Sequence, residues 1–232
     1  ISGANPFGAS APNSVVTFQP GSRYRIDGPL TPAMSGRTYA DFEFNNGSPT
    51  TGTGASAFTV DSLIVSQGTL NVNVTAGSVI RGSIHVKAGG TLNMTPATGT
   101  PSFSFAGTGP QEIDVQGTFN PASNTVLNVN NPNGVNLVNN LSLAGGLSFT
   151  SGNVNTGART LTLSASSTID FGTGANAGAA SVLIFSGAGS FTAGQTLAFT
   201  NFGATGTDRV LFSSSVSGVL GQISLNGSLS GE

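Results

Sequence analysis

Two pairs of carboxylates are the residues of this chain whose spacing best suits chemistry. Asp41 and Glu43 form one pair, and Glu112 and Asp114 form the other, each at alternate positions in a strand-like stretch. Side chains at i and i+2 of a β-strand point to the same side, so each pair places two acids on one face. Paired acids suit glycoside or uronate chemistry. A solvated strand face produces the same spacing without any reaction, and we favour that interpretation.

A row of charged residues precedes the first pair. Arg23, Arg25 and Asp27 also alternate, which favours a surface ion cluster over a clamp for a uronate. Polysaccharide lyases on β-solenoid folds combine cations with several acids along one groove. The seven Lys and Arg residues of this chain are instead spread along its length. We therefore expect no enzyme here, with a polysaccharide lyase or glycoside hydrolase as the alternative.

Two further side chains resemble parts of known kinds of site. His85 is the only histidine, and it has neither a Cys nor an acid pair near it in sequence to complete a metal site or a catalytic triad. Ser62 lies in the motif Asp-Ser-Leu (61–63), which matches a pattern for O-glycosylation. The glycine-rich stretches 47–56 and 172–180 lack the lysine of a phosphate-binding loop, and we expect them to be plain loops. No metal or cofactor is expected.

The elements that carry these residues repeat. Residues 57–74 and 78–95 are two versions of one sequence: Ser-Leu-Ile-Val (62–65) recurs as Ser-Ile-His-Val (83–86), and Gly-Thr-Leu-Asn (68–71) recurs at 90–93. The second spacing is longer than the first by a single position, which a loop insertion explains. Short alternating apolar stretches that recur in this way indicate strands stacked rung upon rung. The sequence therefore predicts an all-β fold, a parallel β-solenoid (β-helix) with rungs of about 20 residues.

Strand signals continue along the whole chain with no helical periodicity between them. An open sheet of so many strands is uncommon, which favours closure into a solenoid. The expected strands cover 15–18, 23–26, 39–44, 58–65, 69–74, 83–86, 91–94, 102–105, 111–115, 125–130, 135–138, 141–145, 147–152, 160–164, 167–171, 181–185, 196–199, 209–212 and 222–225.

The alternation also predicts which side chains fill the interior. The expected inward residues are Leu63, Val65, Leu70, Val72, Ile84, Val86, Leu92 and Met94. The glycines expected at tight corners are Gly68, Gly90, Gly117, Gly146 and Gly152. His85 and its counterpart Ile64 then point outward. Asn71, Asn73 and Asn93 also point outward, where they either form an amide ladder or contact water, and we favour water.

Composition excludes several classes of function. The 232 residues include 34 glycines, no cysteine, seven Lys and Arg, and nine Asp and Glu, far fewer charges than the quarter typical of globular domains. A net charge of −2 without a cation cluster argues against nucleic acid as a partner. No apolar run is long enough for a membrane-spanning helix. The polar, cysteine-free composition favours an exported protein, extracellular or on a bacterial cell surface.

The domain organisation is expected to be simple. Residues 1–18 are interpreted as an extended N-terminal segment or linker, because they contain two prolines and little alternation. Residues 19–232 are expected to form a single β-solenoid domain. Within it, residues 181–232 are a candidate for a distinct C-terminal portion.

The middle of the chain resembles a known kind of repeat. Residues 128–167, with the stretch Phe-Ala-Gly-Thr-Gly-Pro-Gln-Glu-Ile-Asp-Val-Gln-Gly-Thr-Phe before them, resemble the β-solenoid repeats of large secreted, adhesin-like surface proteins of the Bacteroidetes and their relatives. About the last fifty residues, which include the stretches 190–202 and 208–225, are similar instead to terminal segments of bacterial autotransporter-like β-repeat proteins. The resemblance implies a solenoid architecture and export, and it points to no particular activity. The matching residues are Gln111, Ile113, Gly117, Phe119, Asn133, Gly134, Val135, Leu137, Gly146, Leu147, Phe149, Ser151, Gly152, Val154, Thr156, Gly157, Thr160 and Leu161.

These observations favour a structural or adhesive function, as a stalk, a surface-layer component or a filament subunit. Unpaired strand edges at the ends of a solenoid predict self-association through the termini, or contact with neighbouring domains of a longer chain. A carbohydrate-binding or carbohydrate-cleaving solenoid is the second hypothesis, with surface glycans as partners. An ice-binding solenoid is the third. It needs threonines at one position on many rungs, and we expect the threonine row to break after one or two.

Overall fold

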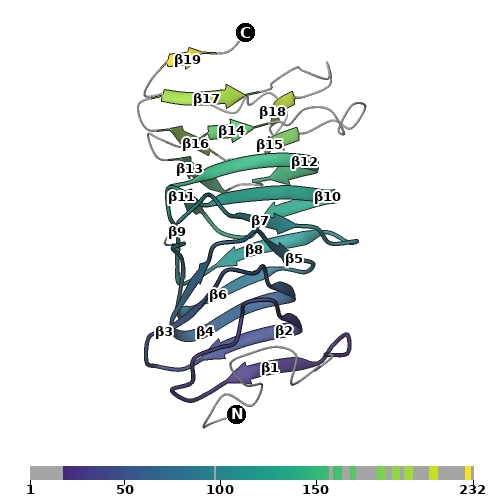
Figure 1. The fold of residues 1–232 in the computed structure, drawn as a ribbon. Helices are drawn as coiled ribbons and strands as arrows, with labels where there is room; N and C mark the ends of the chain where they lie inside the picture. The colour runs from purple at the N-terminus through teal and green to yellow at the C-terminus, as the bar shows by residue number, and fades with distance from the viewer. Residues whose placement is uncertain are drawn as a thin grey trace.

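Parallel strands stacked along one axis make up the described part of the chain (Figure 1). The computed structural model describes residues 18–96, 98–156, 159–163, 168–170, 182–186, 190–193, 196–200, 209–213 and 228–230. These residues contain no helix, and therefore none with the length and apolarity to cross a membrane. The predicted all-β parallel solenoid is confirmed.

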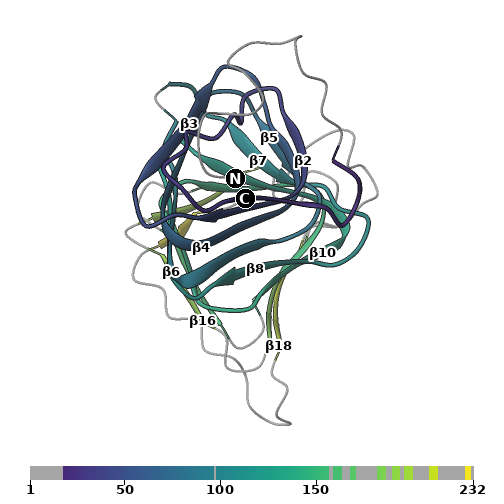
Figure 2. The same cartoon turned by 90° about the horizontal axis from the view of Figure 1, so that it is seen from below.

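The strand pairings sort the strands into three stacks, which surround a common interior in the view down the axis (Figure 2). The long strands contribute to more than one stack because they bend around the corners. The first stack consists of β1 (Arg23–Ile26), β2 (Thr38–Asn45), the middle of β4 (Thr59–Val74), the start of β6 (Ile84–Met94), β8 (Gln111–Val115), the ends of β10 (Val126–Leu137) and β12 (Gly146–Asn155), β15 (Val182–Ser186) and β18 (Arg209–Ser213).

The other two stacks close the coil. The second consists of β3 (Thr50–Gly54), the ends of β4 and β6, β9 (Thr118–Pro121), β11 (Leu141–Leu143), β13 (Thr160–Leu163) and β16 (Ser190–Ala193). The third consists of the starts of β2 and β4, β5 (Ser78–Ile80), β7 (Ser102–Phe105), the starts of β10 and β12, β14 (Thr168–Asp170), β17 (Thr196–Thr200) and β19 (Ser228–Ser230).

The register between β4 and β6 is the one that the sequence repeat predicts. Leu63 pairs with Ile84, and Thr69 pairs with Thr91. The spacing lengthens at a register shift just after Val65, where the extra residue forms a bulge. The predicted insertion therefore lies at the corner between the first and second stacks.

The interior is a continuous apolar column along the axis. All eight side chains predicted to point inward are fully buried. His85 was predicted to point outward, and it is partly exposed. Ile64 was also predicted to point outward, but it is not exposed to solvent as an outward residue would be: only 8% of it is accessible. Ile64 faces away from the column, but it pairs with Glu43 on one side and with His85 on the other, and little of it remains exposed.

The glycine-rich stretch 47–56 was expected to be a loop, and this prediction is wrong. Residues Thr50–Gly54 form β3, which pairs in register with the end of β4. The stretch lacks apolar alternation because glycine takes the inward position: a Cβ on Gly52 would overlap the side chain of buried Met34. Met34 fills the space that a strand side chain would otherwise occupy. The expected loop 172–180 and strand 222–225 lie outside the described residues.

Rung length varies along the axis. Val60 pairs with Ile80 on the next rung, and Ile80 pairs with Phe105 on the rung after it, so the second of these rungs is the longer one. Loops between strands absorb the additional residues, and the paired segments keep their register. The predicted rung of about 20 residues therefore describes the first repeats best.

Candidate functional site

Asp41 and Glu43 lie on the outer face of the first stack, and β1 supplies their partners. The favoured interpretation of a solvated face is wrong for Glu43, which is buried. The register sets Arg23 opposite Asp41 and Arg25 opposite Glu43. One guanidinium nitrogen of Arg23 lies 3.4 Å from Asp41 Oδ2, and the other lies 3.2 Å from Glu43 Oε2. The expected surface ion cluster is thus confirmed, and it includes the first acid pair.

Glu43 is the least accessible member of this cluster. It is only 5% exposed, and the hydroxyl of Ser66 donates a 2.6 Å hydrogen bond to its Oε1. Arg23 holds Oε2, and Arg25 Nη1 lies 3.8 Å from Oε1. Both oxygens are therefore engaged with neighbouring rungs and are not presented to a substrate.

Asp27 completes the cluster at its exposed side. Its Oδ1 accepts hydrogen bonds of 2.7 Å from the Asn45 side chain and from Arg25 Nε. These two bonds, the one from Asn45 first, hold the pKa of Asp27 below its ordinary value. Asp27 thus serves as an anionic bridge between β1 and β2.

The second acid pair has two different environments. Glu112 is exposed, and its backbone N–H donates to the Ser83 hydroxyl. Asp114 is buried, and its carboxylate accepts hydrogen bonds of 3.1 and 3.3 Å from Gln116 and lies 3.8 Å from Lys87 Nζ. The two carboxylates share a strand face, but the structure does not make them one site.

Sequence reasoning missed that His85 has an acid neighbour. The register of β6 with β8 sets His85 opposite Asp114, and its Nδ1 lies 3.7 Å from Asp114 Oδ2, beyond hydrogen-bond distance. The signal was present, because Ser-Ile-His-Val (83–86) aligns with Glu-Ile-Asp-Val (112–115) by its apolar alternation. Within the described residues, no three His, Cys, Asp or Glu side chains are placed to share a metal ion.

Ser62 lies on the outer face of β4, where it pairs with Asp41 of the rung below. It is half-buried, and the backbone of Gly82 passes close to its hydroxyl. The carboxylate of the preceding Asp61 is 4.0 Å from Arg81 Nη1. Glycosylation of Ser62 stays a prediction.

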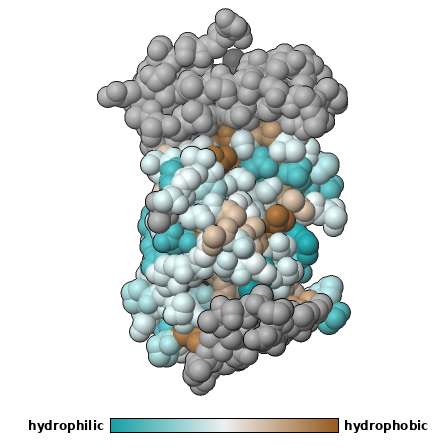
Figure 3. All heavy atoms as spheres, viewed as in Figure 1, coloured by the Kyte–Doolittle hydropathy of each residue, from teal (hydrophilic) through white to brown (hydrophobic). Residues whose placement is uncertain are grey.

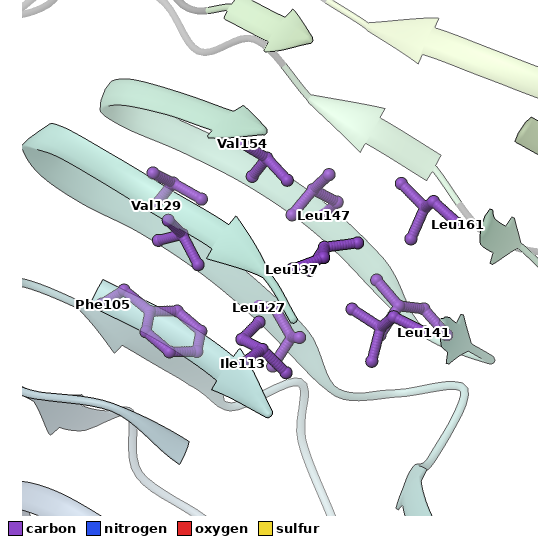
Figure 4. Close-up of a pocket in the computed structure, with 11 residues that line it drawn as sticks. Phe105, Ile113, Leu127, Val129, Leu137, Leu141, Leu147, Val154 and Leu161 are labelled. Carbon is purple, nitrogen blue, oxygen red and sulfur yellow. The ribbon is translucent and has the colours of Figure 1, made fainter. Parts of the chain in front are cut away.

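The interior contains a small cavity between the rungs of β7 to β13. Its volume is about 10 Å³, and the side chains that enclose it come from all three stacks (Figure 4). All of them are apolar, so a water molecule would find no hydrogen-bond partners there. This cavity is a packing defect of the core and not a ligand site.

The second stack carries an ordered polar surface on its outer face, which sequence reasoning underestimated. Thr69, Thr91 and Thr118 occupy one position on three successive rungs. Two positions further along the strands, Asn71 pairs with Asn93, and Asn93 pairs with Asn120. The expectation that the threonine row breaks after one or two rungs is therefore wrong.

The asparagines of this surface form the amide ladder that we did not favour. Asn120 Nδ2 donates to Asn93 Oδ1 at 2.9 Å, Asn93 Nδ2 donates to Asn71 Oδ1 at 2.7 Å, and Asn71 Nδ2 donates to the Thr51 hydroxyl at 3.2 Å. Parallel in-register pairing brings like side chains within reach of one another, so the amides bond to each other.

The comparisons with known proteins give no relative. A scan against protein-family models, a search of the curated proteins and a search of the solved structures each found no match to this chain.

Proposed function

We propose that this chain is a structural rod, a segment of a stalk, surface layer or filament on the outside of a bacterial cell, with no catalytic activity. The observation that supports it is the parallel pairing of strands from β1 to β19 along one axis (Figure 1). Such a coil sets a fixed distance between its two ends and has no need of a ligand to fold. Its length is set by the number of rungs.

The polar side chains support the same proposal. Arg23 bridges to Asp41 and Glu43 across adjacent rungs, and Lys87 lies near Asp114 of the following rung. Chemistry would require these groups to face a substrate, whereas here they link neighbouring strands. Of the acids put forward for glycan cleavage, Asp41, Glu43 and Asp114 are therefore interpreted as links between rungs.

The outer surface supports an exported location. The described residues on the face seen in Figure 3 are mostly hydrophilic or neutral in hydropathy, with hydrophobic residues in small separate patches. The chain has no cysteine and few charged residues, so its solubility depends on Ser, Thr and Asn. The resemblance of residues 128–167 to secreted surface repeats agrees with this location.

The rod is proposed to extend by association of its ends. A parallel rung carries unpaired N–H and C=O groups along its outer edge, so another strand adds without any change of fold. We assign the contacts to residues 1–18 or to the strands near 209–225, and most of both segments lies outside the described residues. The partner is a second copy of this chain or a neighbouring domain.

Electron microscopy and sedimentation velocity over a range of concentrations test this proposal. We expect elongated particles that lengthen with concentration for the intact chain, and shorter ones for a chain that lacks residues 1–18 and has an unchanged circular dichroism spectrum. Particles one chain long at every concentration, for both proteins, would contradict self-association.

A further inference from the structure

The polar surface of the second stack has a regularity that the structural proposal does not require. We define the threonine–asparagine array as two rows on the outer faces of β3, β4, β6 and β9. The first row is Thr69, Thr91 and Thr118, and the second is Thr51, Asn71, Asn93 and Asn120. Successive members of a row are about 4.8 Å apart along the axis, and the rows are about 6.6 Å apart along the strands.

The backbone beneath the array is held in register. From Thr69 onward the pairing of β4 with β6 has no shift, and the pairings of β3 with β4 and of β6 with β9 have none either. The residues between the two rows point inward and pack on one another: Leu70 pairs with Leu92, and Leu92 pairs with Phe119. The spacing of the array is therefore fixed by the core.

The side chains of the array are also fixed. Each asparagine amide donates to the rung before it, which selects one rotamer for each member of the ladder. A primary amide keeps a second N–H and a further lone pair for a ligand. Threonine is stiff at χ1 and presents a methyl group beside its hydroxyl. Thr118 and Asn120 are exposed, and the other five members are half-buried.

The chemistry of the array defines what it can bind. It has no charged side chain, so it offers no complement to a phosphate or another ion. It has no aromatic ring on which a sugar or a base could stack. It offers neutral donors, acceptors and methyl groups at fixed two-dimensional spacing. The ligand that matches is an extended neutral lattice of hydrogen-bonding groups.

We propose that the threonine–asparagine array binds ordered water at the surface of ice. A water molecule held at a protein surface loses up to about 2 kcal/mol of entropy. The water molecules of ice have already lost that entropy, and the side chains of the array are already ordered. Binding therefore costs little further entropy, and many weak contacts together can give a measurable affinity. This activity belongs to the outer face of the second stack and does not depend on association of the chain ends.

Ice itself is the probe for the experiment. The intact chain is assayed for inhibition of ice recrystallisation and for shaping of single ice crystals, against an inert protein at equal mass concentration. We expect inhibition and faceted crystals. Behaviour identical to that of the inert protein would overturn the proposal.

Variants locate the activity on the molecule. Thr91→Tyr places a large side chain in the centre of the array, and Thr59→Tyr places the same side chain on a half-buried threonine of β4 that lies in the third stack. We expect Thr91→Tyr to lose activity several-fold and Thr59→Tyr to keep it, with unfolding midpoints measured for both. Equal loss in the two variants would overturn the assignment to this face.

A nearly isosteric variant covers the case in which Thr91→Tyr does not fold. Asn93→Asp keeps the size of the side chain, removes the donor to Asn71 and adds a charge in the centre of the array. We expect it to lose activity several-fold as well. Full activity of a folded Asn93→Asp chain would contradict the proposal.

Discussion

The backbone carbonyl of Asn131 occupies the space in which Gly152, its partner on the next rung, would carry a side chain. The two residues pair in the register of β10 with β12, and a Cβ built on Gly152 overlaps the Asn131 oxygen. Gly152 also has a φ of +94°, a conformation that other residues rarely adopt. A positive-φ glycine, Gly68, meets the carbonyl of Asn46 in the same way at an earlier rung.

Replacement of Gly152 by alanine is expected to lower the free energy of unfolding by more than about 2 kcal/mol, because the backbone strain and the overlap with Asn131 add. Gly21→Ala is the matched control. Gly21 has a similar φ of +80°, and no atom lies within 4 Å of its Cβ position. Gly21→Ala should therefore lower the free energy of unfolding by only about 1 kcal/mol. Denaturant unfolding measures both, and equal losses would show that backbone conformation alone matters.

The side chain of Asn131 links its own rung to the preceding one, and its removal should be severe. It is completely buried, and its Nδ2 donates to Gly109 O at 2.7 Å and to Gln111 Oε1 at 2.9 Å. Its Oδ1 accepts a hydrogen bond from the backbone N–H of Asn133 at 2.9 Å. Asn131→Ala leaves these groups unsatisfied and should lower the free energy of unfolding by about 2–4 kcal/mol.

A double-mutant cycle separates this network from simple burial. Gln111 Oε1 accepts from both Asn131 and the backbone of Gly107, and its Nε2 donates to Ile80 O. We expect the losses for Gln111→Ala and Asn131→Ala to be non-additive by at least about 0.5 kcal/mol. Additive losses would contradict a shared network.

Substitutions on the first stack test which positions face the apolar column. Val86→Asp places a charge in the apolar column and should lower the free energy of unfolding by about 4 kcal/mol or more, whereas His85→Gln should change it by no more than about 0.5 kcal/mol. Ile64→Asp, outward but covered and opposite Glu43, should also destabilise. Thermal unfolding of the three variants is the measurement, and a severe loss in His85→Gln would contradict the register.

Stability at high pH reports on Tyr39. Burial is the main cause of a pKa for Tyr39 that is raised far above the ordinary value of about 10, and burial also raises the pKa of Tyr24. Below about pH 10 the tyrosines are protonated in both the folded and the unfolded chain, so their raised pKa values cost no stability. Above that pH the unfolded chain ionises more readily than the folded one, and the free energy of unfolding is lowered.

The free energy of unfolding should therefore fall above about pH 10. Tyr39→Phe should flatten this dependence, and Tyr24→Phe should flatten it less. The chain contains two tyrosines and no tryptophan, so tyrosinate absorbance can be followed during the titration. Full ionisation of both tyrosines near their ordinary pKa without unfolding would contradict the burial of Tyr39.

How far the sequence predicts the fold depends on whether apolar alternation survives. It does in 58–65 and 83–86, and there the inward residues and the position of the inserted residue are right. Each of these predicted strands continues into the next one, 69–74 or 91–94, as the single strand β4 or β6. In 50–54 the inward position belongs to Gly52 because Met34 fills the interior, so no alternation marks the strand β3.

The polar contacts were harder to predict for a related reason. Arg23 pairs with Asp41, and His85 pairs with Asp114. The number of residues between the two partners is different in these two pairs, so no single period predicts both contacts. Alternation shows which side of a strand a residue occupies, but the loop lengths decide which residue of the next rung stands opposite it. The threonine row was missed because Thr118 lies further along the chain from Thr91 than the period of the first repeats predicts.

The register of β4 with β6 and β9 is the claim on which both the rod and the array depend, and cysteine cross-linking tests it most directly. The chain has no native cysteine. Cysteines at Thr69 and Thr91, paired across adjacent rungs, should have Cα atoms within the range of about 4.4–6.8 Å that disulfides require. We expect this pair to oxidise readily, and the pair Thr69 and Leu92, whose side chains point to opposite faces, to stay reduced. The reverse result would contradict the stacking of these rungs.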